Sequence, residues 1–480
     1  MRKKLSRICS TAILAVIIIV SIVKISNLME LKESDNRYAS FFVEEQPIDV
    51  LFVGSSHVRH GFFVMELWND YGISAYNLAG NGSTLPVSYW TLVNALDYQT
   101  PKVVVMDVFD MWPGRIFSNS WGQVHQQLDA FPISINKYRM IRDLFDDREL
   151  TDGSGNPIYN KRWEIFWNLG EYHTRWTGLT EGDFDSEKTL IQNSRVWKGS
   201  EPLIDVVERE EHIYNKSADE LQYDDVARDY LERMISLCKE RGIELLLINT
   251  SYDCSDEAKL FHDSVNEIAE ANSLLYLDFT QENIINFDTD LYTTGHNTHV
   301  NFSGAEKFAA YIGGKLKENY ELEDHRTNPD YERWTEDYEA FVESKEQYLR
   351  DQTDVVKYML LLSDKSYRII FEIRDATVLS ETNVAGMFAN LGIDITGENN
   401  LICIDMEEQS IDCLDNDYLT GSEWNTAVGL LHLDVNEEGI YEMYLNGDEL
   451  YRVDPGEDNS KLKITVIRKK TGDVIDVKSF

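Results

Sequence analysis

Short apolar runs alternate with helical stretches through the first two-thirds of this 480-residue chain. The runs are bounded by turns and contain few polar residues, which is the pattern of strands buried on both faces of a sheet. They predict strands at Ile48–Val53, Ser74–Leu78, Lys102–Val108, Ile243–Asn249 and Leu274–Asp278. The stretches between and after them predict helices at Phe62–Tyr71, Pro86–Leu96, Asp225–Arg241, Asp256–Ala271 and Ala305–Asn319. This alternation favours an α/β fold with a parallel central sheet.

An uncharged segment near the N-terminus follows a basic cluster. Four Lys and Arg residues within the first seven positions precede the run Ile8–Val23. Together with Lys24, whose side chain can reach the interface, the run is just long enough for a membrane-spanning helix. The basic flank predicts a cytoplasmic N-terminus, with the chain after about residue 30 outside. We expect a single-pass anchor in the cell membrane over residues 1–30; the alternative is a cleaved signal peptide, although no small-x-small site follows Val23.

The composition changes again further along the chain. Over residues 112–223 the alternation stops and Trp, Asn, Gly and Asp become frequent, which predicts an insertion in a domain spanning 45–320. Residues 321–352 are highly charged and predict a solvated helical linker. Residues 353–480 form an expected β-rich α+β domain, in which Asn446-Gly447 is a strong hairpin signal. Its predicted strands are Tyr367–Ile373, Leu401–Asp405, Leu430–Val435, Ile440–Leu445, Lys461–Arg468 and Val474–Phe480.

The charge and cysteine content exclude some functions. There are 84 Asp and Glu against 45 Lys and Arg, a formal net charge of −39. Such an acidic surface repels phosphate backbones, so nucleic-acid binding is disfavoured. The five cysteines include no C-x-x-C pair, which leaves zinc-knuckle and thioredoxin-like sites without support. We expect free thiols, with a Cys403–Cys413 bridge across a hairpin as the alternative.

Three short blocks carry candidate chemistry. Gly54-Ser55-Ser56 follows the first predicted strand, at the sheet edge where open α/β proteins bind ligands. The Gly-rich segment 77–84 follows the second strand, and a glycine there lets a backbone N–H point into the same cleft. His299, in the segment HVNFSGA before the last predicted helix, can act as a general base toward a serine. Each block alone is an ordinary turn; the combination indicates a nucleophilic serine.

In this order and on these elements, the blocks resemble the SGNH/GDSL hydrolase family over residues 45–320, apart from the insertion. The segment HVNFSGA is similar to the H-x-N-x-x-G-A run of surface-polysaccharide members. The resemblance implies an SGNH-type three-layer sandwich with a parallel central sheet. It assigns the nucleophile to Ser56, an oxyanion-binding backbone N–H to Gly82 and the base to His299, and it implies no cofactor.

Two positions depart from the family pattern. The family's aspartate, three residues before the histidine, is replaced by His296, and an imidazole cannot stabilise a charged His299 as a carboxylate does. The family's third-block asparagine falls at Phe109. One oxyanion donor is therefore missing, and loss of one such donor typically lowers the rate about a hundred- to a thousandfold. Asp107 and Asp110 are candidates for a substitute acid; the alternative is that they cap the turn after the strand.

Zinc is an alternative ligand for the histidines of these blocks. His57, His60, His296 and His299 form two H-x-x-H pairs on loops that are expected to meet. Imidazole is a common zinc ligand. Matches this short are frequent by chance, so the leading expectation includes no metal.

Binding to a polymer is suggested in two further places. The insertion carries His173, Arg175 and Trp176, a combination suited to a sugar or an anionic polymer, or else to packing of an amphipathic helix. The C-terminal domain resembles the interleave-type domain in its YRIIFEIRD strand, its Asn-Gly hairpin and its terminal TGDVIDVKSF hairpin. That resemblance implies a glycan-binding or docking accessory.

The expected function is a membrane-anchored, extracytoplasmic serine esterase or O-acyltransferase. Its expected substrate is an acylated polysaccharide or a cell-wall polymer. The alternative is a catalytically impaired SGNH scaffold that binds or helps assemble surface glycan, which His296 and Phe109 favour. A zinc-dependent hydrolase using the four histidines is a third, weaker alternative.

Overall fold

The structure is a computed structural model whose internal contacts group the chain into two compact units. Unit 1 comprises Met1–Glu201, Tyr214–Glu282 and Gly313–Tyr338, and unit 2 comprises Pro202–Ile213, Asn283–Ile312 and Glu339–Phe480. The predicted domain bounds, 45–320 and 353–480, stay a prediction. The structure describes residues 2–29, 38–111, 121–145, 162–167, 169–185, 187–207, 223–250, 256–279, 284–285, 289–292, 299–395, 399–415, 422–435, 441–453 and 460–480.

The central sheet of unit 1 is parallel, with five strands in the order β2-β1-β3-β4-β5. Each strand lies within a predicted run, and β1, β2 and β3 are buried throughout because both faces of the sheet are covered. The chain passes from β1 to β2 on one side and returns to β3 on the other, so β1 and β3 flank a topological switch point. The strands are β1 (Val50–Val53), β2 (Ala75–Asn77), β3 (Val103–Asp107), β4 (Glu244–Asn249) and β5 (Leu275–Asp278).

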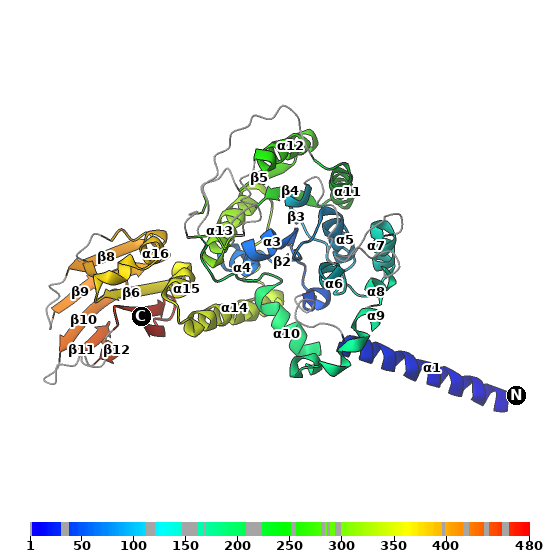
Figure 1. The fold of residues 1–480 in the computed structure, drawn as a ribbon, viewed down its shortest axis with the longest axis horizontal. Helices are drawn as coiled ribbons and strands as arrows, with labels where there is room; N and C mark the ends of the chain where they lie inside the picture. Colours follow the sequence, from blue (N-terminus) through cyan, green and yellow to red (C-terminus); the bar gives the residue numbers. More distant parts are fainter. Residues whose placement is uncertain are drawn as a thin grey trace. The chain divides into compact units, whose positions relative to one another are not determined.

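Helices lie on both faces of this sheet (Figure 1). α5 and α11 pack against each other on one face, and α4 lies on the opposite face (Figure 1). The ends of α11 follow local chemistry: the Asp224 side chain accepts the N–H of Val226 at 2.8 Å, and Gly242 ends the helix at φ +67°. Outside the insertion, the helices between Ser56 and Asn319 are α3 (Ser56–Gly61), α4 (Val64–Tyr71), α5 (Leu85–Ala95), α11 (Asp225–Arg241), α12 (Asp256–Asn272) and α13 (Phe302–Asn319).

The insertion is helical in its described part. Met140, Ile141 and Leu144 are buried on one face of α7, which packs against α5 and α8. Several of these helices are only four or five residues long, so they are held by packing rather than by their own stability. They are α6 (Trp121–Leu128), α7 (Ile135–Phe145), α8 (Arg162–Phe166), α9 (Leu169–Tyr172) and α10 (Glu187–Trp197), with 3-10 turns η5 (His173–Thr177) and η6 (Glu181–Phe184).

One N-terminal helix, α1 (Arg2–Met29), is long and apolar enough over Cys9–Met29 to cross a membrane. A signal sequence has the same length and composition. The end of α1 is bonded to the insertion: Trp167 Nε1 donates to Ser26 Oγ at 3.2 Å, and the Arg175 guanidinium donates to the Met29 carbonyl. The last turn of α1 therefore packs as part of unit 1.

Unit 2 contains two antiparallel sheets, of orders β14-β13-β6-β7-β8 and β12-β11-β10-β9. Ile370, Leu401 and Ile467 of the first sheet share a core with Leu431 and Met443 of the second, so the sheets pack face to face. This agrees with the predicted β-rich domain. The strands are β6 (Tyr367–Ile373), β7 (Asn399–Asp405), β8 (Ser410–Asp415), β9 (Ser422–Thr426), β10 (Gly429–Val435), β11 (Tyr441–Leu445), β12 (Asp448–Val453), β13 (Leu462–Arg468) and β14 (Val474–Ser479).

Two sequence signals in unit 2 have clear outcomes. Asn446 and Gly447 join β11 to β12 with φ of +55° and +94°, the two positive values of a type I′ hairpin turn. Cys403 pairs with Asp412 and Cys413 with Ile402. The two cysteines therefore point to opposite faces of the sheet, and no disulfide joins them. The alternative of a bridge between them is wrong.

The charged segment 321–352 is α-helical from Glu332 to Asp351, and this helix is not fully solvated. α14 (Glu332–Asp351) buries Trp334, Phe341 and Leu349 along one face, at spacings of seven and eight residues. The remaining short elements of the fold are α15 (Val355–Leu360), α16 (Val384–Asn390) and the 3-10 turns η2 (Phe41–Val43), η3 (Phe109–Met111), η7 (Pro329–Tyr331), η8 (Leu361–Ser363) and η9 (Ala376–Ser380).

Candidate active site

Gly54 ends β1 where the neighbouring strand β3 passes closest. A Cβ atom at this position would lie 2.7 Å from Asp107 Cβ and 2.9 Å from Val58 Cγ2, and the backbone has a φ of +154°. Distances this short do not occur between real side chains, so only glycine lets the chain turn here from the strand into the serine block. The requirement for glycine at position 54 is thus a steric consequence of the sheet order.

We expect Gly54→Ala to destabilise the fold by about 1–3 kcal/mol, the usual cost of overpacking a close-packed interior, and to lower any activity with it. Gly242→Ala is the matched control, because that glycine also has a positive φ but has no atom within 4 Å of the added Cβ. Thermal unfolding of the full chain in detergent measures both. Equal destabilisation by the two variants would show that close approach to β3 is unimportant.

The two serines of the block have different surroundings. The Ser55 side chain is buried, donates to Asp107 Oδ2 at 3.3 Å and lies 3.4 Å from His57 Nδ1. Ser56 is the first residue of α3 and is half-buried, whereas Ser55 and His57 on either side of it are only 3% and 2% exposed. Of the two serines, Ser56 is therefore the more exposed.

Asp107 holds the serine block from the end of β3. Its carboxylate also accepts the backbone N–H of Phe109 at 3.2 Å. Burial raises the pKa of Asp107 to about 7, while hydrogen bonds from Phe109 and Ser55 act in the opposite direction. Asp107 contacts Ser55, the residue before the candidate nucleophile. A buried carboxyl group therefore lies at the switch point between β1 and β3. The structure thus gives Asp107 a role in fixing the block; its role as a substitute acid for His299 stays a prediction.

The Gly-rich segment after β2 is joined to the serine block by backbone hydrogen bonds. Gly80 N–H donates to the Gly54 carbonyl at 3.1 Å, and Leu78 N–H donates to the Phe52 carbonyl at 2.8 Å. Gly82 is exposed in the turn that follows, with φ +65°. The first two predicted blocks are thus adjacent in space.

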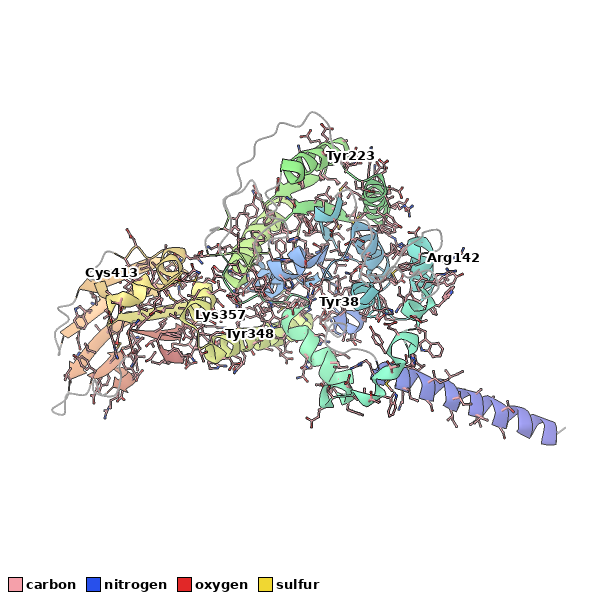
Figure 2. All side chains as sticks on the ribbon, viewed as in Figure 1. Tyr38, Arg142, Tyr223, Tyr348, Lys357 and Cys413 are labelled. Carbon is pink, nitrogen blue, oxygen red and sulfur yellow. The ribbon has the colours of Figure 1, made fainter. Side chains whose placement is uncertain are left out.

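Side chains from other segments also form hydrogen bonds to the Gly-rich turn. The hydroxyl of Tyr38, labelled in Figure 2, donates to the carbonyls of Leu78 and Ala79 at 2.8 and 3.1 Å. Gln127 of α6 donates to the carbonyl of Asn81, which precedes Gly82. The insertion therefore contacts the turn that carries the candidate oxyanion donor.

Asn77 is a positioning residue that the sequence analysis did not single out. It is buried at the end of β2, donates to the Val58 carbonyl at 2.9 Å and accepts the N–H of Ala79 at 3.1 Å. These bonds tie the first turn after the serine to the Gly-rich segment. An amide side chain ending a buried strand was the available signal, because a buried polar group needs partners.

Phe109, at the position where the predicted resemblance places an asparagine, makes an aromatic contact. Its ring lies edge-on to the His57 ring, with centroids 4.2 Å apart. His60 points elsewhere, with Nδ1 2.9 Å from the Glu201 carbonyl, and Asp110 is buried in η3. A phenyl ring donates no hydrogen bond to an oxyanion; the loss of one donor at this position stays a prediction.

His299 lies in unit 2 on a loop organised by Asn301. The Asn301 amide donates to the carbonyls of Thr289 and Asp205 at 2.7 and 3.0 Å, and its oxygen accepts the N–H of Gly304 at 3.3 Å. His299 itself is half-buried, and its carbonyl accepts a hydrogen bond from Tyr292. The pairing of His299 with Ser56 stays a prediction. His296 lies outside the described residues, and the four-histidine zinc site stays untested with it.

The three candidate polymer-binding residues of the insertion lie in η5. Arg175 pairs with Asp183 at 2.9 Å and also contacts the end of α1, so at least part of its role is structural. His173 is exposed and bonds the Gly170 carbonyl, and Trp176 is 66% exposed. A substrate contact by His173, Arg175 or Trp176 stays a prediction.

Comparisons with known proteins add little to this geometry. No protein-family model and no curated protein matches the chain. Among solved structures, the chain is similar to a candidate acylhydrolase from Bacteroides fragilis, with 11% sequence identity and a TM-score of 0.30. The match covers 60% of this chain and 98% of that chain. At such a score the likeness supports no conclusion about activity, so the function is argued from the site.

Proposed function

We propose that the chain is a serine esterase or O-acyltransferase that is anchored in the membrane and acts outside the cytoplasm on acylated surface polysaccharide or a cell-wall polymer. The observation that carries this proposal is the partly exposed Ser56 at the carboxyl end of β1. It lies between two buried neighbours, next to a Gly-rich turn that is bonded to the same block. Open α/β sheets bind their ligands at this position.

The proposed chemistry uses side chains and backbone groups of the chain itself. Ser56 Oγ attacks the ester carbonyl while His299 accepts its proton, and the backbone N–H groups of Ser56 and Gly82 bind the oxyanion. The C–O bond to the alcohol then breaks, and His299 returns the proton to that alcohol. Water or an acceptor hydroxyl finally attacks the acyl-serine, which gives hydrolysis or transfer.

Other features of the chain support a substrate at a surface outside the membrane. α1 is long and apolar enough to hold the chain at a bilayer. Trp163, Trp167 and Trp176 of the insertion are 47%, 46% and 66% exposed. Exposed aromatic rings of this kind are suited to stacking on sugars or to the membrane interface. The β-sandwich of unit 2 is proposed as the accessory that docks on glycan.

A second candidate function is a scaffold that binds glycan without turning it over. The observation that favours it is the packing of Phe109 on His57 where an oxyanion donor is expected. In that case Ser56 would contact the acyl group as a hydrogen-bonding side chain only.

Covalent labelling tests the proposal directly. We expect a fluorophosphonate probe to modify the full-length protein in detergent on the peptide carrying Ser56, because a phosphonyl group reports an activated serine. Mass spectrometry locates the adduct, and heat-denatured protein is the control. An adduct on another serine would contradict the assignment, and no adduct together with glycan binding would favour the scaffold.

A further inference from the structure

A buried histidine of the insertion is held in one orientation by its neighbours. The ring nitrogen Nδ1 of His125, in α6, lies 2.8 and 2.9 Å from the two carboxylate oxygens of Asp129. The Tyr172 hydroxyl donates to the same carboxylate at 2.8 Å. Since an ionised carboxylate only accepts, this network assigns a proton to Nδ1, and in the neutral imidazole the lone pair is then on Nε2. A carboxylate behind an imidazole is the arrangement that orients histidine ligands in metal sites.

Two glutamates stand close to this histidine. Glu164 of α8 and Glu171 of α9 each bring a carboxylate oxygen to a point where the ligand atoms of all three residues lie within 4.8 Å of one another. Two ionised carboxylates held this close repel each other, and a cation bound between them offsets the repulsion. One imidazole and two carboxylates make a donor set suited to a divalent transition metal such as zinc, with a further position for water.

A glycine in α9 leaves room for the Glu164 side chain. A Cβ on Gly170 would lie 3.1 Å from Glu164 Cγ and 3.7 Å from its carboxyl carbon and one carboxylate oxygen. The Glu164 side chain therefore passes over the one residue of α9 that has no side chain, immediately before Glu171. This close approach brings the two carboxylates together although they come from different helices.

We propose that His125, Glu164 and Glu171 form a zinc-binding site that fastens the insertion. α8 and α9 have five and four residues, too few to persist as isolated helices. An ion that joins them to α6 would fix all three, as structural metals do in small domains with little core. Gln127, two residues after His125, bonds the Asn81 carbonyl beside Gly82. The site would thus also steady the Gly-rich turn.

Metal binding by the full-length protein in detergent tests this site. After treatment with a chelator and desalting, we expect the protein to take up one zinc ion per chain, measured by mass spectrometry of the metal and by competition with a chromophoric chelator. Zinc should also raise the thermal unfolding midpoint by several degrees. Glu171→Gln should weaken zinc binding at least tenfold, and Asp129→Asn should weaken it about 10- to 100-fold through the orientation of His125.

The controls separate this site from zinc bound elsewhere. Glu171 is half-buried, so its replacement tests binding with less risk to folding than replacement of the buried His125. Glu181→Gln, the same change on an exposed residue of η6, should leave affinity and thermal shift unchanged. Absence of saturable binding in the wild type would overturn the proposal. So would equal affinity in wild type and Glu171→Gln, because the zinc would then be bound by other residues.

Discussion

Replacement of Ser56 by alanine is expected to reduce hydrolysis of a generic acetyl ester by about 10⁴- to 10⁶-fold in kcat, the range seen when a serine hydrolase loses its nucleophile. The reason is geometric: Ser56 is the partly exposed serine of the block, while the Ser55 hydroxyl is buried against Asp107. The measurement is steady-state hydrolysis by the full-length protein in detergent.

Ser55→Ala is the matched variant for that experiment. It removes a hydroxyl one residue away and the bond to Asp107, and we expect it to retain measurable hydrolysis. Activity that survives in Ser56→Ala but disappears in Ser55→Ala would reverse the assignment. Inactivity of the wild type on acetyl esters and on acylated glycan would leave the scaffold function as the better account.

The contribution of Asp107 to stability is expected to fall as pH rises from about 4 to about 7, and Asp107→Asn should remove that contribution. Burial raises the pKa of Asp107 from 3.8 to about 7, so the folded chain binds this proton more tightly than the unfolded chain. The stabilisation from the proton is complete below the unfolded pKa and is lost as pH rises through the folded one. At about 1.4 kcal/mol per pKa unit, the full difference is about 4 kcal/mol.

Thermal unfolding of wild type and Asp107→Asn at pH 4, 5.5, 7 and 8 measures this difference, because other titrating groups contribute equally to both proteins. Asp110→Asn is the control for the same chemical change three residues along the chain. Parallel stability profiles for wild type and Asp107→Asn would show that Asp107 ionises with little cost in the folded protein.

Much of the central fold follows from local patterns in the sequence. The strands buried on both faces, such as β3, are uninterrupted apolar runs, and Asp224 and Gly242 mark the ends of α11. The short helices of the insertion escape such reasoning, because α8 and α9 depend on tertiary contacts rather than on their own periodicity. The buried face of α14 is also hard to recognise in the sequence, because charged residues surround Trp334 and Phe341.

The candidate site divides in the same way. The adjacency of Ser56 and the Gly-rich turn follows from the rule that carboxyl ends of neighbouring parallel strands share an edge. The pairing of Ser55 with Asp107 and of Asn77 with Val58 depends on side-chain packing between segments 19 to 52 residues apart, which no local spacing encodes. The cluster of His125, Glu164 and Glu171 is spread over three helices and has no motif spacing for the same reason.

The hydrogen bonds from Trp167 to Ser26 and from Arg175 to Met29 connect the end of α1 to the insertion. A helix bonded to the insertion in this way is held beside it at that end. With α1 in a bilayer, the insertion would stay near the lipid surface. Under the proposed function, acyl groups near the membrane would then be reached more readily than distant ones, and a version of the protein freed from α1 would lose that preference.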